Sequence, residues 1–250
     1  MSQTRNGWEI RVVAGAGFTS LCQAFGGNDI RLGENGPLEF SAWSPHADEL
    51  EDPAAAATRI HSLQVFLNGA LRINAVSHHI HPIIFREFHA DGRRHRVAAE
   101  ILEEYPFSTN ADIDADLTGF RDPTRHLSSN LLFHAKNHEP IRVILAITGL
   151  ISTRSTTGRI FSWNALYKLL DTVKHYSNEF GWGMDEFANK TAIKSFTGAC
   201  NNMSVIGLNA RHGVTKGGIP KKCVATFDEA SAIIIPMASS FCGKYLNEKT

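Results

Sequence analysis

The alternation of polar and apolar residues in the N-terminal part of the chain predicts two short β-strands and one helix. Residues 9–14 and 38–43 alternate in polarity and are rich in β-branched or aromatic side chains, which is typical of half-buried strands. The glycine-rich stretch 26–37 indicates turns between them. Residues 54–67 follow an Asp-Pro pair and repeat apolar positions at helical spacing, so they predict an amphipathic helix that packs on the sheet.

A β-hairpin is predicted where two strand-like segments flank Asp91-Gly92. Residues 80–89 and 94–102 form these segments, and Asp-Gly between two such runs is typical of a tight turn. Because proline has no N–H to donate, Pro82 indicates that the first segment lies at a sheet edge or starts late. The N-terminal part is therefore predicted to be a mixed antiparallel sheet with one helix.

The pattern changes after residue 105. Residues 106–126 are acidic and rich in turn formers without a hydrophobic period, which indicates a linker. Beyond the linker, apolar positions recur at helical spacing almost to the end, apart from a polar loop at 152–158. The predicted helices cover residues 127–138, 139–150, 163–176, 185–196, 200–208 and 230–245.

These elements predict an α+β protein of two domains. Residues 1–105 form an α+β domain of unknown role, and residues 127–250 form an all-α helical bundle. The last helix is expected to begin with a capping box made by Thr226 and Glu229. Pro236 is expected to kink or interrupt that helix.

The composition narrows the classes of protein to consider. The 250 residues hold 25 Lys and Arg against 25 Asp and Glu, so only a local basic patch could bind a polyanion. No apolar run approaches the roughly 20 residues that cross a bilayer. The four cysteines are scattered, which is typical of reduced thiols rather than of a zinc site. We therefore expect a cytoplasmic protein without a membrane segment, metal or cofactor.

Three short motifs have both a possible chemical function and a purely structural interpretation. Gly15-Ala16-Gly17 follows a strand but lacks the third glycine of a dinucleotide-binding turn, so a simple glycine turn is favoured. His79 and His81 share one face of a strand without further metal ligands, so exposed histidines are favoured. Arg93 and Arg94, near the tip of the predicted hairpin, are candidate phosphate contacts, and the alternative is a solvated turn.

The strongest local signal is the pair Arg211-His212, where a predicted helix gives way to a loop and Gly213 suits a helix C-cap. An arginine binds phosphate and a histidine moves a proton near neutral pH, so the pair suits acid–base chemistry on a phosphate ester. The alternative is that both residues only complement the negative end of the helix dipole. Residue chemistry alone leaves both interpretations open.

Three segments of the helical half also carry a likeness to a known family. They are residues 163–168 (WNALYK), 209–213 (NARHG) and 227–230 (FDEA). These segments resemble HEPN-like domains of bacterial proteins, which are helical bundles, often dimeric, from toxin–antitoxin, abortive-infection and other phage-defence systems. The resemblance covers residues 127–250 and implies a helical bundle that acts on RNA.

In active members of this family, an Arg, a following polar residue and a His a few positions later form a metal-independent ribonuclease site. The resemblance implies that Arg211 stabilises the charged phosphorane while His212 acts as acid or base when the RNA 2′-hydroxyl attacks its own phosphate. This chain departs from the pattern, because Lys216, Gly217 and Gly218 stand where the distal His is expected. The basic loop supplies the candidate phosphate contacts Lys216, Lys221 and Lys222.

These residues lead to two hypotheses of function. The first is a defence-associated protein that binds RNA, or cleaves it as a metal-independent ribonuclease, with Arg211 and His212 as its site. It is expected to form a homodimer or to pair with a protein of a defence or toxin–antitoxin system. The second is a catalytically inactive HEPN-like module that dimerises or docks a partner through an apolar face such as 233–237. A third interpretation gives the basic hairpin and loop an antitoxin or immunity role.

Overall fold

The chain divides into two compact units, each defined by the contacts among its own residues. The structure is a computed structural model. It describes residues 8–13, 18–36, 39–74, 84–90, 93–95, 101–109, 122–151, 156–212 and 222–250, and of these only the backbone at 35–36, 84–90, 93–95 and 156–157. Unit 1 comprises Met1–Ala70 and Ile80–Arg142, and unit 2 comprises Leu71–His79 and Val143–Thr250.

The division between the units falls elsewhere than the predicted linker at 106–126. It passes between Arg142 and Val143, inside a helix, because the first helix of the predicted bundle belongs to unit 1. That helix, α4 (Leu127–Ala135), packs against the short turn η2 (Pro123–Arg125) at the end of the predicted linker. Of that linker, residues 110–121 lie outside the described part of the chain.

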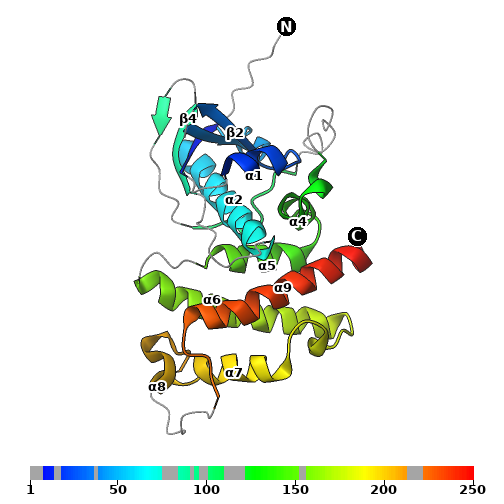
Figure 1. Ribbon diagram of the computed structural model, residues 1–250. Helices are drawn as coiled ribbons and strands as arrows, with labels where there is room; N and C mark the ends of the chain where they lie inside the picture. The colour runs from blue at the N-terminus through cyan, green and yellow to red at the C-terminus, as the bar shows by residue number, and fades with distance from the viewer. Residues whose placement is uncertain are drawn as a thin grey trace. The chain divides into compact units, whose positions relative to one another are not determined.

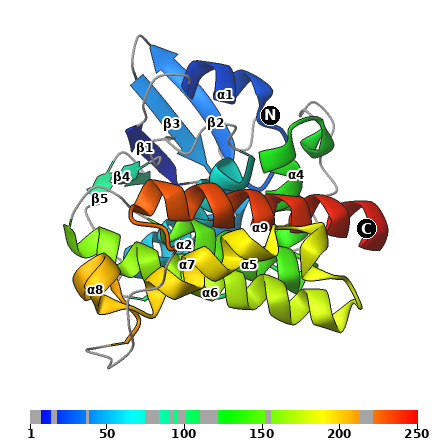
Figure 2. The ribbon, with the colours of Figure 1, turned by 60° about the horizontal axis from the view of Figure 1, so that its bottom comes forward.

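The described strands of unit 1 form a five-stranded antiparallel sheet in the order β2-β3-β1-β4-β5 (Figures 1 and 2, with all five labelled in Figure 2). Ile10 of the central strand lies opposite Ala42 of β3, and Ile10 and Val12 are buried while Arg11 is exposed, as the predicted alternation requires. The strands are β1 (Glu9–Val13), β2 (Arg31–Gly36), β3 (Glu39–Trp43), β4 (Ile84–Ala90) and β5 (Arg93–His95).

The predicted hairpin is confirmed, and one predicted turn is wrong. β4 and β5 pair on either side of Asp91-Gly92, although the second strand is shorter than the predicted segment. The stretch 26–37 was expected to form turns, yet its second half is β2. Gly33 serves the sheet here, because a Cβ at this position would come within 2.8 Å of the Trp43 ring on β3.

Two helices are found among the described residues of the N-terminal part, where the sequence predicts one. The additional helix is α1 (Phe18–Ala24), which packs on β2 and places the Phe18 ring 4.7 Å from that of Phe40. The predicted helix is α2 (Pro53–Asn74), which continues past the predicted end at residue 67. Its predicted inner face is confirmed, since these side chains are fully buried: Ile60, Leu63 and Leu67.

A buried polar cluster joins three segments of unit 1. The Oδ1 atom of Asp29 lies 3.0 Å from Lys136 Nζ and 3.0 Å from His46 Nε2, and all three side chains are buried. The backbone N–H of Ser108 donates to His46 Nδ1 at 3.0 Å, so the ring proton sits on Nε2 and is donated to Asp29. We call Asp29, His46 and Lys136 the buried polar cluster. It connects the C-cap residue of α4 with the bend before β2 and with the short turn η1 (Pro45–Ala47).

Helices and 3-10 turns are the only regular secondary structure among the described residues of unit 2. α6 and α9 lie side by side and α7 packs against both, as two views agree (Figures 1 and 2). Two expectations are wrong here: α6 begins inside the predicted loop at 152–158, and α9 continues through Pro236 without interruption. The helices are α5 (Glu139–Gly149), shared between the units, α6 (Thr156–Glu179), α7 (Lys190–Cys200), α8 (Met203–Ile206) and α9 (Phe227–Lys249), with the turns η3 (Met184–Glu186) and η4 (Gly207–Asn209).

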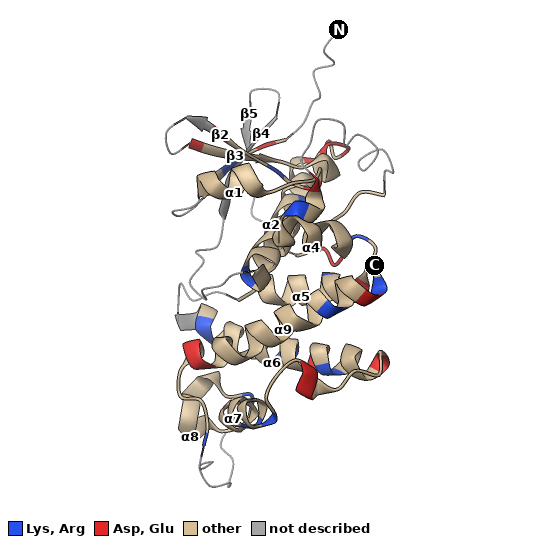
Figure 3. Ribbon diagram, turned by 45° about the vertical axis from the view of Figure 1, so that its right-hand side comes forward, with Lys and Arg blue, Asp and Glu red and all other residues tan. Residues whose placement is uncertain are grey.

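The charged residues are mixed in sign along the described ribbon. Figure 3 shows Lys and Arg positions interspersed with Asp and Glu positions, in agreement with a net charge of zero. None of the helices that the structure describes combines the length and the apolar character that crossing a membrane demands. Any basic surface must therefore be local, as the composition predicts.

The capping box at the start of α9 is confirmed. The Thr226 hydroxyl accepts the Glu229 N–H at 3.2 Å, and the Glu229 carboxylate accepts the N–H groups of Ala225 and Thr226. These bonds satisfy backbone donors that the first turn of a helix leaves without partners.

Thr226→Ala is expected to lower the free energy of unfolding by about 1 kcal/mol, because it removes the side-chain acceptor of the cap. Chemical denaturation followed by circular dichroism measures the difference. Ser240→Ala, at an exposed position inside the same helix, is the matched control and should change stability by less than about 0.5 kcal/mol. Equal effects of the two changes would contradict a stabilising cap.

Candidate functional site

Arg211 is positioned by the end of α7 and by η4. Its backbone N–H donates to the carbonyl of Cys200 at 2.7 Å, which ties the segment after η4 to the last residue of α7. Within η4, the Asn209 side chain donates to the Ile206 carbonyl at 2.8 Å and holds the turn closed. These two hydrogen bonds fix the backbone from which the Arg211 side chain extends.

The Arg211 guanidinium lies over an aromatic ring on α6. Its Cζ atom is 4.5 Å from the centre of the Tyr167 ring, a cation–π arrangement that is worth about 0.5–1 kcal/mol at an exposed site. Arg211 is exposed, and no carboxylate of the described residues forms an ion pair with it. The side chain is therefore held in place while its hydrogen-bond donors stay open to solvent.

Tyr167 is supported from behind by the packing of α7 on α6. The ring of Phe196 is fully buried and lies 6.3 Å from the Tyr167 ring and 6.3 Å from the Trp163 indole, on which it stacks at an angle of 7°. The Phe227 ring, at the start of α9, meets Trp163 edge-on at 5.9 Å. The aromatic platform under Arg211 is thus an extension of the core of unit 2.

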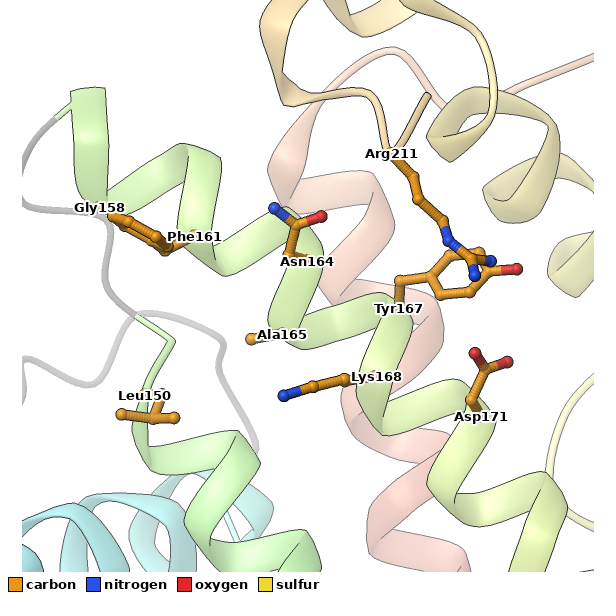
Figure 4. Close-up of a pocket in the computed structure, with 9 residues that line it drawn as sticks. All are labelled: Leu150, Gly158, Phe161, Asn164, Ala165, Tyr167, Lys168, Asp171 and Arg211. Carbon is orange, nitrogen blue, oxygen red and sulfur yellow. The ribbon is translucent and has the colours of Figure 1, made fainter. Parts of the chain in front are cut away.

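An open cavity of about 680 Å³ adjoins this platform, within the roughly 300–1,000 Å³ of ligand sites. Figure 4 shows Arg211 lying over Tyr167 on one side of α6 and Lys168 extending on the other side, toward Leu150. Phe161 is 66% exposed and Leu150 is 50% exposed, so the rim is apolar. The lining residues are Leu150, Gly158, Phe161, Asn164, Ala165, Tyr167, Lys168, Asp171 and Arg211.

The cavity combines two cations, one carboxylate and an aromatic face. Arg211 and Lys168 offer positively charged donors, whereas Asp171 offers only acceptors. Phe161 exposes its ring to solvent, although phenylalanine is usually buried in the core. Such a set suits a ligand with a negative charge, a flat apolar group and a hydrogen-bond donor.

The other expected site residues whose side chains the structure describes, His212 and Lys222, do not line this cavity. Both are exposed. Lys216 and Lys221 lie outside the described residues. Arg93 and Arg94 belong to β5 in unit 1, where the backbone alone is described. Of the expected residues whose side chains are described, Arg211 alone lines the cavity.

Sequence reasoning missed the contribution of α6 to this site. Phe161, Asn164, Lys168 and Asp171 follow one another at spacings of three or four residues, which places them on one face of a helix. The buried residues Trp163, Leu166 and Leu170 occupy the opposite face, and their apolar spacing is the signal that the sequence pattern shows. A search for polar and aromatic residues on the outer face of this helix would have found the site.

Cys200 is not a nucleophile of this site. Burial raises the pKa of its thiol to about 12, and the positive charge of nearby Arg211 opposes that rise with a smaller effect. The thiol is therefore protonated at neutral pH and acts as a packing residue.

Metal chemistry has no candidate centre in the described part of the chain, where no three His, Cys, Asp or Glu side chains gather as a metal site requires. The histidines at 78–81 and the Gly15-Ala16-Gly17 motif lie outside the described residues.

The comparisons with known proteins found no family model, no curated protein and no solved structure that matches the chain. The chemistry of the cavity in unit 2 is consequently the basis for a function.

Proposed function

We propose that this chain binds RNA at the cavity of unit 2 and that Arg211 is the principal phosphate contact. The observation that carries the proposal is the exposed guanidinium held 4.5 Å over Tyr167, without an ion-pair partner among the described residues. A pre-oriented guanidinium presents paired N–H donors that match two phosphate oxygens. Little side-chain entropy is then lost when a phosphate binds.

Lys168 supports a polyanion rather than a single phosphate as the ligand. Its side chain extends on the other side of α6 from Arg211, so two cations border one cavity (Figure 4). A chain of phosphates that crosses α6 would contact both cations and release a counterion at each. Binding through two such contacts weakens as salt is added, which a purely apolar ligand would not do.

The resemblance to HEPN-like domains extends the proposal to metal-independent cleavage, with His212 as the acid or base beside Arg211. Because His212 does not line the cavity, the geometry supports RNA binding more directly than cleavage. The resemblance also implies a cytoplasmic, defence-associated protein that works as a homodimer or with a toxin–antitoxin partner.

A protein partner is the second candidate for this surface, and the exposed apolar rim favours it. Phe161 and Leu150 are exposed on the cavity, and Leu208 on η4 is 75% exposed. The face at 233–237, expected to dock a partner, is not that surface. Ile234, Ile235 and Met237 are buried and belong to the core.

Arg211→Ala is expected to weaken RNA binding about tenfold or more, because hydrogen bonds from a charged donor to phosphate are worth about 1.5–3 kcal/mol. Fluorescence anisotropy of a labelled unstructured RNA, with the full chain and a metal chelator, measures the affinity. Arg211→Lys keeps the charge but loses the paired donors, so an intermediate affinity is expected.

The matched control is Arg159→Ala, which removes an exposed arginine of α6 that does not line the cavity. Unchanged affinity for RNA is expected for this variant. Equal losses of affinity at both positions would show that Arg211 acts only through the net charge of the chain. If Arg211→Ala binds RNA as the wild type does, the proposed function is wrong. Gel analysis of the same mixtures tests cleavage, which His212→Ala should abolish without weakening binding.

A further inference from the structure

The exposed face of α6 carries three kinds of group that match three parts of a nucleotide. Phe161, Lys168 and Asp171 all line the cavity, and all three side chains are exposed. Phe161 and Lys168 are two helical turns apart, about 10 Å along the axis. This spacing lets separate parts of one extended ligand reach an aromatic ring, a cation and a carboxylate on the same helix.

Phe161 suits a base that is not paired. Its ring is 66% exposed at the rim, whereas Trp163, two residues further along α6, is 4% exposed in the core. Stacking of a base on an aromatic side chain is worth about 1–3 kcal/mol and tolerates any sequence. Bases inside a duplex are already stacked on each other, so only an unpaired base offers a free face to this ring.

Asp171 suits a sugar hydroxyl. A carboxylate in the lining repels phosphates, and no described cation forms an ion pair with Asp171. An ionised carboxylate only accepts hydrogen bonds, so its favourable neighbour in a polyanion is a donor. The ribose 2′-hydroxyl is such a donor, and DNA lacks it.

We propose that the cavity selects unpaired RNA over DNA and over duplex RNA, with a base stacked on Phe161 and a ribose 2′-hydroxyl donating to Asp171. This inference rests on the proposed RNA binding at Arg211. Arg211 and Lys168 supply affinity for any phosphate chain, whereas Phe161 and Asp171 supply the choice among chains. Selectivity and affinity are therefore carried by different residues of one cavity.

The test compares three labelled probes of one sequence by fluorescence anisotropy on the full chain: single-stranded RNA, single-stranded DNA and duplex RNA. The wild type is expected to bind single-stranded RNA about tenfold or more tightly than either competitor, as expected for one hydrogen bond to a charged group or one stacked base. Equal affinity for all three probes would overturn the inference.

Variants assign the selectivity to its two residues. Asp171→Ala should weaken RNA binding and strengthen DNA binding, and Asp171→Asn, which keeps an acceptor, should retain part of the preference for RNA. If both variants bind RNA and DNA more tightly by the same factor, Asp171 only repels phosphate and the hydroxyl contact is wrong. Asp185→Asn, at an exposed aspartate outside the cavity, is the control.

Phe161→Leu should weaken single-stranded RNA binding about fivefold or more, and Phe161→Trp should restore it, because the stacking needs a ring rather than bulk. Equal affinities of the Leu and Trp variants would contradict the stacking. Results that contradict the roles of Asp171 or Phe161 do not contradict RNA binding at Arg211, provided that Arg211→Ala still weakens binding. Loss of the Arg211 effect would instead remove both proposals.

Discussion

Lys136→Met is expected to lower the free energy of unfolding of unit 1 by about 3–5 kcal/mol, the usual effect of removing one partner from a buried ion pair. Lys136 Nζ lies 3.0 Å from Asp29 Oδ1, and both side chains are buried. Methionine fills a similar volume, so the loss comes from charge rather than from a cavity. The Asp29 carboxylate would remain away from water with His46 as its neighbour.

The loss is expected to be large because the rest of the buried polar cluster cannot adapt. The His46 ring accepts the Ser108 N–H at Nδ1, which leaves one proton, on Nε2, for Asp29. That proton already points at the same oxygen as Lys136. A neutral imidazole cannot replace the charge of an ammonium group, so removing Lys136 takes the cationic partner away from the buried Asp29 carboxylate.

A double-mutant cycle isolates this interaction. Asp29→Asn should also destabilise, because it leaves a buried cation, whereas the double variant Asp29→Asn/Lys136→Met should recover much of the loss. Lys190→Met, at an exposed lysine at the start of α7, is the matched control and should change stability by less than about 0.5 kcal/mol. Additive single effects in a urea titration would show that the pair does not interact.

The elements that the sequence predicts well are those whose signals are local. The inner face of α2 repeats at helical spacing, and the cap of α9 needs only Thr226 and Glu229, three residues apart. The pairing of β4 with β5 is predicted from one Asp-Gly pair in the sequence. In each case the residues that decide the structure are neighbours in the chain, so the pattern alone contains the answer.

The elements that the sequence misses depend on partners far away in the chain. β2 has the sequence RLGENG, which is poor in strand formers, and it becomes a strand because it pairs with β3. α1 likewise packs on β2 and on Phe40. Tertiary pairing overrides weak local preference at both places, and no hydrophobic period signals it.

The candidate site divides in the same way. Arg211 was found from its own chemistry, since an arginine at the end of a helical segment is a local signal. Its contact with Tyr167 requires that α7 and η4 pack against α6, which no local pattern contains. His212 was paired with Arg211 because the two are adjacent, but adjacent side chains in a bend do not face one cavity.

Phe196→Ala is expected to lower the free energy of unfolding of unit 2 by about 3–5 kcal/mol, because it empties a packed position of the core. The Phe196 ring is fully buried between α6 and α7, and it contacts Trp163 and Tyr167. The control is Phe161→Ala, the same change at a ring that is 66% exposed, and it should alter stability by less than about 0.5 kcal/mol.

Phe196 also links the core to the site. Because Tyr167 loses its support in Phe196→Ala, the ring under Arg211 should move, and the folded fraction should bind RNA more weakly than the wild type. The fluorescence of Trp163, which stacks on Phe196 at 7°, should change in the folded protein, whereas Phe161→Ala should leave it unchanged. If stability falls while fluorescence and RNA affinity stay those of the wild type, Phe196 fills space without positioning Tyr167.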